Sequence, residues 1–532
     1  MRICLINPPL SVHEFPHLAL PMLKGYLADK GFDCTVRDFN VEIMSDIIDQ
    51  GLEKVQRYFY ERGVKYQYAE IKRRYDDARR IFWAPNAQGH HDRAQKLINT
   101  YLRIAGSNIF DVCFRPDTLE KIQQGFAHCD VQSDGNPILR FIRERILDYF
   151  VQHPADVVGI SIPFTSQIFY AFVIGRELKR LMPQVKIVMG GPQISLFWKL
   201  FCDHKPFRAA FDVMIAGMGE LAMEGYLRAV ETGSGLDEVP SLIYFDQRGE
   251  LRVNPQKKLA RMSELPEADF SDLPLERYVY AKLPYQFSRG CYWGKCAFCS
   301  YRNNKGYIIR KTEEVLEHFG NMERRYGIHN FQFIDDAIHP TLLDQMAGQI
   351  LKKGMKIRYD AYLRLEPGFT TEVCQRLRES GLKTVLFGFE SANQRMLELM
   401  NKGNTPSNML RVLKNMHQAG IQSILSCLIG FPTETWEEAM DSIRFLKENR
   451  AYYYWVYIVH FGMISDMCGH AGDYGVVEMD QNRLIRYDDS GFVALGYPYQ
   501  TTRGMTVEES LCAIQAGRQE LGITIFPDNF FS

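Results

Sequence analysis

The chain has 532 residues, of which 46% are hydrophobic, 24% charged and 13% aromatic, and this composition excludes a disordered, collagen-like or low-complexity protein. At roughly 150 residues per domain, the length predicts about three domains. Lys and Arg (63 residues) balance Asp and Glu (64), so the formal charge of −1 gives no general attraction to nucleic acid or to anionic membranes.

The first residues contain no signal-peptide pattern, and no apolar run reaches the 18 residues that a membrane span needs. We therefore expect a cytoplasmic protein with no membrane span and no nucleic-acid partner. In a reducing compartment most of the 12 cysteines should be free thiols, unless some of them bind metal.

Residues 1–240 predict a doubly wound, Rossmann-like α/β domain. Apolar strand patterns alternate with helical patterns, as in a parallel sheet covered by helices. The strand patterns lie at 2–7, 34–39, 156–163, 186–191 and 212–220, and the helical ones at 18–29 and 167–181. Residues 41–143 have a polar helical pattern and are predicted to be a helical insertion. Gly190, Gly191, Gly217 and Gly219 fall at the predicted strand ends, where open α/β sheets bind ligands, although βα turns also favour glycine.

A proline-rich and acidic stretch at 241–284 predicts a linker, and a second unit follows it. Strand patterns there alternate with amphipathic helices, which indicates a partial (β/α)6 barrel over residues 285–460. These strand patterns lie at 286–289, 331–336, 356–363, 384–390, 423–430 and 455–460. Residues 461–532 are predicted to form a small C-terminal cap that contributes to substrate choice.

The strongest chemical signal is SRGCYWGKCAFCSYR, which places Cys291, Cys296 and Cys299 directly after the first predicted barrel strand. Three thiolates so close in sequence can bind one metal centre, and thiolates select zinc or iron–sulfur clusters. A structural zinc needs four closed ligands, so the fourth would have to come from a distant segment. Three ligands on a 4Fe-4S cluster leave one iron open.

This segment resembles the radical S-adenosylmethionine (SAM) superfamily, and the domain order is similar to that of its cobalamin (B12)-binding branch. The resemblance implies that Cys291, Cys296 and Cys299 hold a 4Fe-4S cluster whose open iron binds SAM. The spacing here is C-x4-C-x2-C, whereas the family pattern is C-x3-C-x2-C. We expect Gly294 to accommodate the additional residue.

The resemblance also implies residues that contact the two cofactors. For SAM they are residues near the strand ends and in the cysteine loop, namely Phe298, Asp335, Asp336, Arg364, Glu390, Ser391 and Gly430. For cobalamin they lie in the loops of the first domain, namely Pro8, Ser161, Thr165, Gly190, Gly191, Pro192, Gly217, Gly219 and Glu220. The D-x-H-x-x-G motif of other cobalamin proteins is absent, as is usual in this branch.

The resemblance implies a cobalamin-dependent C-methyltransferase, which uses a 5′-deoxyadenosyl radical and methylcobalamin to methylate an unactivated carbon of a metabolite or peptide. It also implies an electron donor such as flavodoxin or ferredoxin. Two alternatives remain open: a non-methylating rearrangement, cyclisation or epimerisation with the same cofactors, and a non-catalytic cobalamin or SAM sensor. No residue is assigned as a catalytic acid or base.

Overall fold

The computed structural model describes residues 1–9, 11, 15–50, 137–278, 280–299, 306–462, 466–480, 485–486 and 495–523, and a few positions between 76 and 132. Most of the predicted helical insertion at 41–143 therefore lies outside the described residues. No helix among the described residues combines the length and the apolar character needed to cross a membrane.

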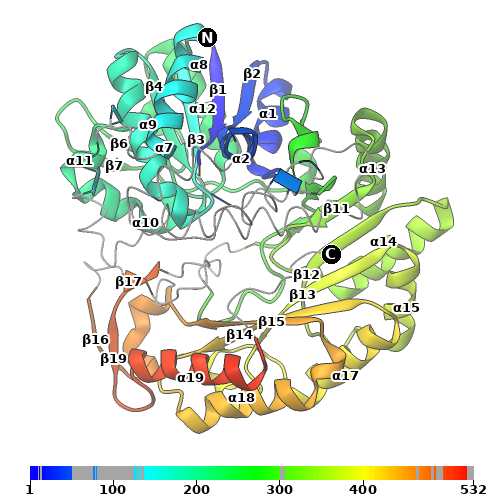
Figure 1. Ribbon diagram of the computed structural model, residues 1–532. Coiled ribbons are helices and arrows are strands. Elements are labelled where there is room, and N and C mark those ends of the chain that lie inside the picture. The colour runs from blue at the N-terminus through cyan, green and yellow to red at the C-terminus, as the bar shows by residue number, and fades with distance from the viewer. Residues whose placement is uncertain are drawn as a thin grey trace. The chain divides into compact units, whose positions relative to one another are not determined.

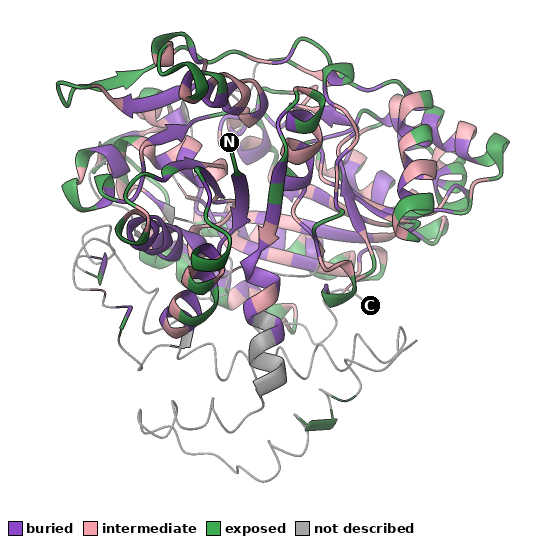
Figure 2. Ribbon diagram, turned by 90° about the horizontal axis from the view of Figure 1, so that it is seen from above, coloured by how far each residue is buried: buried purple, intermediate pink, exposed green. Residues whose placement is uncertain are grey.

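The chain divides into two compact units (Figure 1). The first contains residues 1–259 and 265–281, and the second contains residues 260–264 and 282–527. In both units the strands are mostly buried, and the exposed residues are concentrated on helices and loops (Figure 2).

The first unit is a doubly wound α/β sheet, as predicted. Its strand order is β2-β1-β3-β4-β5-β6-β7, and the neighbours from β2 to β5 are parallel. The strands are β1 (Ile3–Asn7), β2 (Cys34–Asp38), β3 (Val157–Ser161), β4 (Lys186–Gly190), β5 (Val213–Ile215), β6 (Leu242–Phe245) and β7 (Leu251–Val253). The strand order reverses between β1 and β3, because β2 lies on one side of β1 and β3 on the other, so the loops after β1 and β3 flank the place where such sheets bind ligands.

Along the chain, the helices of this unit lie between the strands. They are α1 (Ala19–Asp29), α2 (Phe39–Gln50), α7 (Pro137–Phe141), the π-helical turn η1 (Ile142–Leu147), α8 (Asp148–Gln152), α9 (Ile168–Leu181), α10 (Pro192–Asp203), α11 (Lys205–Arg208) and α12 (Gly219–Thr232). Every residue of α9 from Ile168 to Leu178 is buried, so this helix is central to the core. Its ring at Phe172 contacts those of Phe201 and Phe207, with centroids 4.8 and 4.6 Å apart.

The predicted linker at 241–284 begins differently from expectation, because its first residues form a hairpin. Strands β6 and β7 extend the sheet from β5 with antiparallel pairing. Asp246 closes the turn by accepting hydrogen bonds from the backbone of Arg248 and Glu250. These strands have four and three residues, which is too short for a convincing pattern within a polar stretch.

The second unit contains the predicted six-stranded parallel sheet of a partial (β/α)6 barrel, in the order β15-β14-β13-β12-β11-β8. The strands are β8 (Leu283–Tyr285), β11 (Asn330–Phe333), β12 (Arg358–Arg364), β13 (Leu382–Glu390), β14 (Gln422–Ile429) and β15 (Trp455–His460). The helices are α13 (Thr312–Tyr326), α14 (Pro340–Lys353), α15 (Thr371–Glu379), α16 (Gln394–Leu399), α17 (Pro406–Gln418) and α18 (Trp436–Glu448).

Local sequence explains where these helices begin and end. Thr435 and Glu438 form a capping box at the start of α18. Gly327 and Gly354 end α13 and α14 in the left-handed conformation, which glycine adopts without steric cost. The first barrel strand is three residues earlier than predicted, because β9 (Ser288–Arg289) leaves the sheet and pairs with β10 (Ile308–Ile309).

The C-terminal residues follow β15 with short elements and one helix. They are η7 (Asp466–Tyr474), β16 (Val476–Met479), β17 (Ile485–Arg486), β18 (Leu495–Gly496), β19 (Tyr499–Thr501) and α19 (Val507–Glu520). Helix α19 packs against α18 and β15. Buried Phe461, Met467 and Val476 share one apolar cluster with Ala297 and Phe431, so this region covers the carboxyl end of the barrel strands.

Candidate cofactor sites

The loop that carries the three cysteines is attached to the end of β11. Buried Asp335 accepts hydrogen bonds from the backbone nitrogens of Phe287 (3.2 Å) and Ser288 and from Ser288 Oγ (2.6 Å). Burial raises the pKa of Asp335 to about 7. Three residues after Ser288, Cys291 pairs with Ala337 in an isolated parallel bridge. Asp335 therefore positions the start of the cysteine loop.

Cys296 is the most buried of the three cysteines and lies beside two cations. Arg364 Nη1 donates a hydrogen bond to Cys296 Sγ over 3.6 Å. Burial raises the pKa of the Cys296 thiol, whereas the charges of Lys402 and Arg364 lower it and a charge on Cys291 raises it. A thiolate at Cys296 is thus stabilised by both cations.

A second attachment joins the cysteine loop to the Met400–Gly403 loop before α17. Ala297 N donates to Met400 O over 2.9 Å, and Trp293 Nε1 donates to Asn401 O over 2.8 Å. The Trp293 ring lies against Gly403, where a Cβ atom would come within 2.2 Å of the ring. Gly294 has a φ of +57°, so it supplies the left-handed turn expected for the longer spacing.

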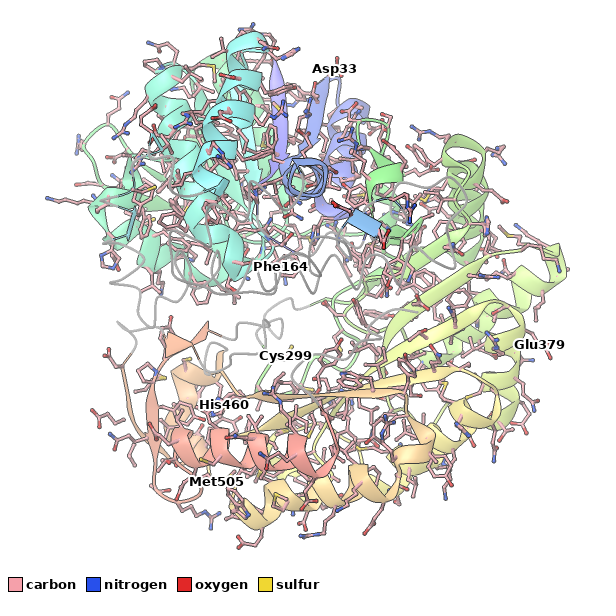
Figure 3. All side chains as sticks on the ribbon, in the orientation of Figure 1. Asp33, Phe164, Cys299, Glu379, His460 and Met505 are labelled. Carbon is pink, nitrogen blue, oxygen red and sulfur yellow. The ribbon has the colours of Figure 1, made fainter. Side chains whose placement is uncertain are left out.

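Phe298 joins this loop to the rest of the barrel. Its side chain packs against the apolar cluster that contains Phe431 and Met467. The Lys402 Nζ atom lies 5.6 Å from the Phe298 ring centroid. The aromatic residue before the third cysteine is therefore part of a packed interior. Cys299, labelled in Figure 3, is partly buried, and no described cysteine forms a disulfide.

Glu390 occupies a strained position at the end of β13. Its φ is +65°, which is unusual for a residue with a side chain, and the register of β13 against β14 shifts between Gly388 and Glu390. Glu390 Oε1 accepts a hydrogen bond from Lys402 Nζ over 2.9 Å, and both side chains are buried. A Cβ atom at Gly388 would lie 2.6 Å from Glu390 Oε1, so this close arrangement requires glycine.

Two other predicted SAM residues have different surroundings. Ser391 is fully buried, and its hydroxyl is 3.0 Å from Ser442 Oγ and accepts from Asn393 N, so it connects the end of β13 to α16 and α18. Asp336 follows the end of β11, and burial of its carboxyl group raises its pKa, although the Gly290 backbone and the charge of Arg289 lower it.

The loop after β14 is held by a buried carboxyl group. Gly430 N donates to Glu434 Oε2 over 2.6 Å, and Tyr499 OH donates to Gly430 O over 2.7 Å. Burial raises the pKa of Glu434 to about 8. A Cβ atom at Gly430, whose φ is +88°, would lie 2.6 Å from Nε2 of His460 at the end of β15 (Figure 3).

The donor set around the cysteine loop fits an iron–sulfur cluster. It consists of three cysteines on one loop, none of them in a disulfide, with Arg364 and Lys402 beside the buried member. In the described part of the chain, no three His, Cys, Asp or Glu side chains converge closely enough to hold a single metal ion.

In the first unit, the predicted cobalamin loops meet at the ends of β4 and β5. Ser195 Oγ donates to Gly191 O over 3.1 Å and accepts from Gly217 N over 2.9 Å, so one hydroxyl joins the two glycine loops. Gly191 and Gly217 have φ angles of +100° and +111°. A Cβ atom at Gly191 would be 2.8 Å from the backbone nitrogen of Ile162.

The same loops leave room for a ligand. A Cβ atom at Gly219 would meet nothing within 4 Å, and one at Gly190 would meet only Ile215 O, at 3.9 Å. Gln193 Oε1 is buried and accepts no hydrogen bond from the described residues, although Gln193 Nε2 donates to Pro163 O. A buried acceptor and open glycine backbone fit a ligand with amide donors, such as the side chains of a corrin ring.

A polar network holds the other predicted cobalamin residues. Buried Gln167 donates to Asn7 Oδ1 (2.8 Å) and to Pro8 O (2.6 Å), and Asn7 donates to Asp38 Oδ1 (3.0 Å). Tyr278 OH donates to Asp38 Oδ2 over 2.6 Å. The remaining predicted residues lie on nearby element ends: Ser161 ends β3, Thr165 begins the turn η2 (Thr165–Gln167), Pro192 begins α10, and Glu220 is in the first turn of α12.

Sequence reasoning missed several residues of these sites, namely Trp293, Lys402, Glu434, Gln193 and Ser195. Only Trp293 and Glu434 carried a local signal, since Trp293 belongs to the lengthened cysteine spacing and Glu434 follows Gly430 by four residues.

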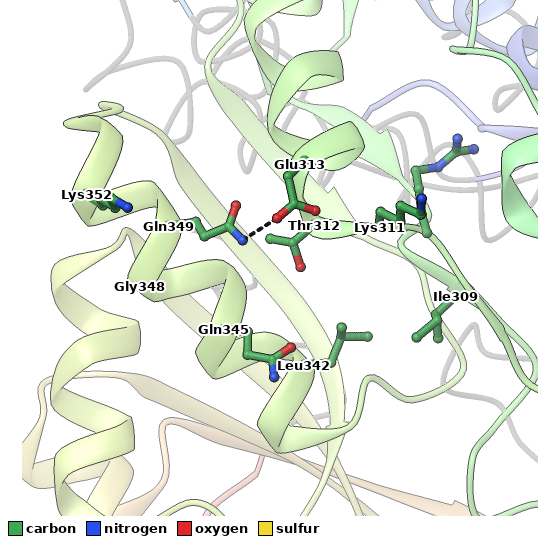
Figure 4. A pocket seen from close by; sticks show the side chains of 10 residues that line it. Ile309, Lys311, Thr312, Glu313, Leu342, Gln345, Gly348, Gln349 and Lys352 are labelled. Atoms are coloured by element: carbon green, nitrogen blue, oxygen red, sulfur yellow. Dashed lines mark hydrogen bonds between the residues drawn. The ribbon is translucent and has the colours of Figure 1, made fainter.

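A groove of about 550 Å³ lies between the start of α13 and one face of α14 (Figure 4). Lys311, Glu313, Leu342, Gln349 and Lys352 are among its lining residues, and Gln349 Nε2 donates to Glu313 Oε1 over 2.7 Å. None of the predicted site residues lines it.

Comparison with known proteins finds one family model that matches part of each unit. Residues 83–227 match the model of the B12 binding domain, and residues 285–446 match that of the radical SAM superfamily. An uncharacterised methyltransferase of Pyrococcus horikoshii is 30% identical over 301 residues, which cover 55% of this chain and 64% of the relative. The anaerobic magnesium-protoporphyrin IX monomethyl ester cyclase of Rubrivivax gelatinosus is 22% identical over 305 residues, or 55% of this chain and 54% of the relative.

The chain thus spans about half to two thirds of the length of these curated relatives. Among solved structures, the fold is similar to that of the radical SAM methyltransferase TsrM from Kitasatospora setae, with a TM-score of 0.60 and 15% identity over 98% of this chain and 88% of that one. It is also similar to the cobalamin-dependent radical enzyme OxsB, with a TM-score of 0.57 and 16% identity over 84% and 52% of the two chains.

The radical SAM domain implies a 4Fe-4S cluster and SAM, and the B12-binding domain implies cobalamin. The B12-binding domain precedes the radical SAM domain, which is the order that the sequence predicted. The chain therefore contains a radical SAM domain that follows a B12-binding domain.

Proposed function

We propose that this protein is a cobalamin-dependent radical SAM C-methyltransferase that methylates an unactivated carbon of a metabolite or peptide. The observation that carries the proposal is the buried thiol of Cys296 beside Arg364 and Lys402, on a loop with two further cysteines. This loop follows the first strands of a barrel that succeeds a B12-binding domain. Two of the similar proteins, the Pyrococcus horikoshii relative and TsrM, are named as methyltransferases, which supports the methylating reaction.

When bound, the cluster and SAM would supply a 5′-deoxyadenosyl radical, and cobalamin would carry a methyl group to the substrate radical. The chain's own residues hold these groups. Cys291, Cys296 and Cys299 would ligate the cluster, and Asp335 fixes the start of their loop. The Glu390–Lys402 pair presents a preformed polar group at the end of β13, where an ammonium or hydroxyl group of SAM would bind.

In the first unit, the loops after β1, β3, β4 and β5 would receive cobalamin. Ser195 holds the two glycine loops together, and Gln193 offers its buried Oε1 to an amide of the corrin. The Gln167–Asn7–Asp38 network fixes the loop that begins at Pro8. We further propose that a small electron-transfer protein, such as flavodoxin or ferredoxin, reduces the cluster.

Anaerobic reconstitution tests the function. The protein is reconstituted with iron, sulfide and cobalamin, given methyl-labelled SAM and a chemical reductant, and analysed for labelled methylcobalamin, S-adenosylhomocysteine and 5′-deoxyadenosine. Labelled methylcobalamin with S-adenosylhomocysteine is expected, because transfer to cobalamin needs no substrate. If cobalamin is bound and 5′-deoxyadenosine is the sole product, the protein is a non-methylating radical enzyme. If neither cofactor binds, the proposal is wrong.

A further inference from the structure

The Arg364 side chain makes a contact that SAM binding does not require. Its Nη1 atom donates to Cys296 Sγ over 3.6 Å, and both residues are buried, with exposed fractions of 5% and 8%. A donor to a ligand sulfur in a buried site acts on the charge of the metal centre as well as on its geometry.

The orientation of Arg364 is fixed by three further contacts. Arg364 Nε donates to Glu366 Oε1 over 2.7 Å, and Nη2 donates to the backbone oxygen of Lys402. The guanidinium carbon lies 4.8 Å from the centroid of the Trp293 ring. Since these groups hold the guanidinium plane, Nη1 is directed at Cys296 before any cofactor binds.

Trp293 is held in turn by groups on the neighbouring loop. Its Nε1 atom donates to Asn401 O, and its ring fills the space that a side chain at residue 403 would need, where the chain has glycine. Trp293 belongs to the four residues between Cys291 and Cys296, where the family pattern has three. The lengthened loop therefore provides the surface on which Arg364 lies.

We propose that Arg364 is a positioning residue that raises the reduction potential of the 4Fe-4S cluster through its hydrogen bond to Cys296, and that Trp293 holds it in place. This inference rests on the proposed function, because it assumes the cluster. Reduction adds one electron from an external reductant to the cluster and breaks no bond. The added negative charge is partly borne by the ligand sulfurs, so a cationic donor at one sulfur favours the reduced form.

The experiment measures the midpoint potential of the reconstituted full-length protein by redox titration, with the EPR signal of the reduced cluster as the readout. Arg364→Met should lower the midpoint potential, because it removes the positive charge and the hydrogen-bond donor to Cys296. Methionine replaces the aliphatic part of the arginine side chain. We expect about a tenfold change in the reduction equilibrium, equivalent to about 59 mV for one electron. Arg364→Lys keeps the charge and should give a midpoint potential between those of wild type and Arg364→Met.

Trp293→Ala should lower the potential as well, because Arg364 loses the ring beneath it. In the double variant with Arg364→Met, the additional effect of Trp293→Ala should largely disappear. The matched control is Arg376→Met. Arg376 lies on the exposed surface of α15, where it pairs with Asp344 of α14, so its replacement should leave the midpoint potential unchanged.

Equal potentials in wild type and Arg364→Met, at equal iron and sulfide content, would overturn the inference while leaving the proposed function intact. A wild-type protein that assembles no 4Fe-4S cluster would overturn both. If Arg364→Met does not assemble a cluster, Arg364→Lys and Trp293→Ala decide the question, and wild-type potentials in both would overturn the inference.

Discussion

At the residue scale, the clearest energetic dependence is that between Glu390 and Lys402. Both side chains are buried, so removing one partner leaves an uncompensated charge. We expect Lys402→Met to destabilise the barrel by about 3–5 kcal/mol. The double variant with Glu390→Gln should recover much of this loss, because no buried charge remains.

The measurement is the denaturant midpoint of the apoprotein. Lys383→Met is the control, because Lys383 is an exposed lysine on β13, the strand that ends at Glu390. Equal destabilisation by Lys402→Met and by the double variant would contradict the argument. In that case, packing and not charge would account for the effect.

Glu434 gives a second prediction at this scale, since burial raises its pKa from 4.5 to about 8. Between these values the folded chain holds a proton that the unfolded chain releases, so stability falls as pH rises from about 4.5 to 8. Glutamine mimics the protonated side chain and does not ionise. The melting temperature of Glu434→Gln should therefore exceed that of wild type by an amount that grows over this range and is constant above it. A difference that does not change with pH would contradict the raised pKa.

The site residues were predictable only where their chemistry shows in adjacent sequence. The three cysteines, Glu390 and Gly430 could be proposed from motifs at strand ends. Lys402 and Ser195 could not, because their partners are brought to them by the tertiary fold, across 12 residues for Lys402 and 22 for Ser195. Residue patterns give no information about which side chains of separate loops meet.

At the element scale, the loop between β4 and α10 depends on Gly191. Its φ of +100° and its closeness to Ile162 both exclude a side chain. We expect Gly191→Ala to destabilise the first unit by about 1–3 kcal/mol and to weaken cobalamin binding at least tenfold. The measurements are thermal unfolding and a titration followed by cobalamin absorbance.

Gly219→Ala is the matched variant, because a Cβ atom there meets nothing within 4 Å and the backbone has no positive φ. It should fold with wild-type stability. Weakened cobalamin binding in this variant would indicate that the ligand occupies the open space beside Gly219, whereas unchanged binding would place it elsewhere.

Apolar periodicity predicted all five parallel strands of the first sheet and five of the six barrel strands at nearly the observed positions. β1 and β5 are buried on both faces and are continuously apolar or nearly so, whereas β2 and β12 alternate buried with more exposed residues, and both patterns are typical of strands. The exceptions have other causes. β8 contains Leu283-Pro284-Tyr285, in which proline obscures the strand pattern, and β6 and β7 are an antiparallel edge hairpin of only a few residues.

At the scale of the whole molecule, each unit contains its own core and its own predicted cofactor residues. The two cofactors should therefore be separable by substitution. Replacing Cys291, Cys296 and Cys299 together by alanine should abolish iron binding and leave cobalamin affinity within about threefold of wild type, because no substituted residue belongs to the first unit. Gly191→Ala should have the reverse effect, with full iron content and weakened cobalamin binding.

Iron and sulfide analysis and cobalamin absorbance on the same samples give this comparison directly. Production of S-adenosylhomocysteine should be lost in the triple-cysteine variant and reduced in Gly191→Ala at limiting cobalamin, since the proposed methyl transfer needs SAM at the barrel and cobalamin in the first domain. A triple-cysteine variant that also fails to bind cobalamin would show that cobalamin binding depends on the barrel's cluster, and the assignment of each cofactor to one unit would then be wrong.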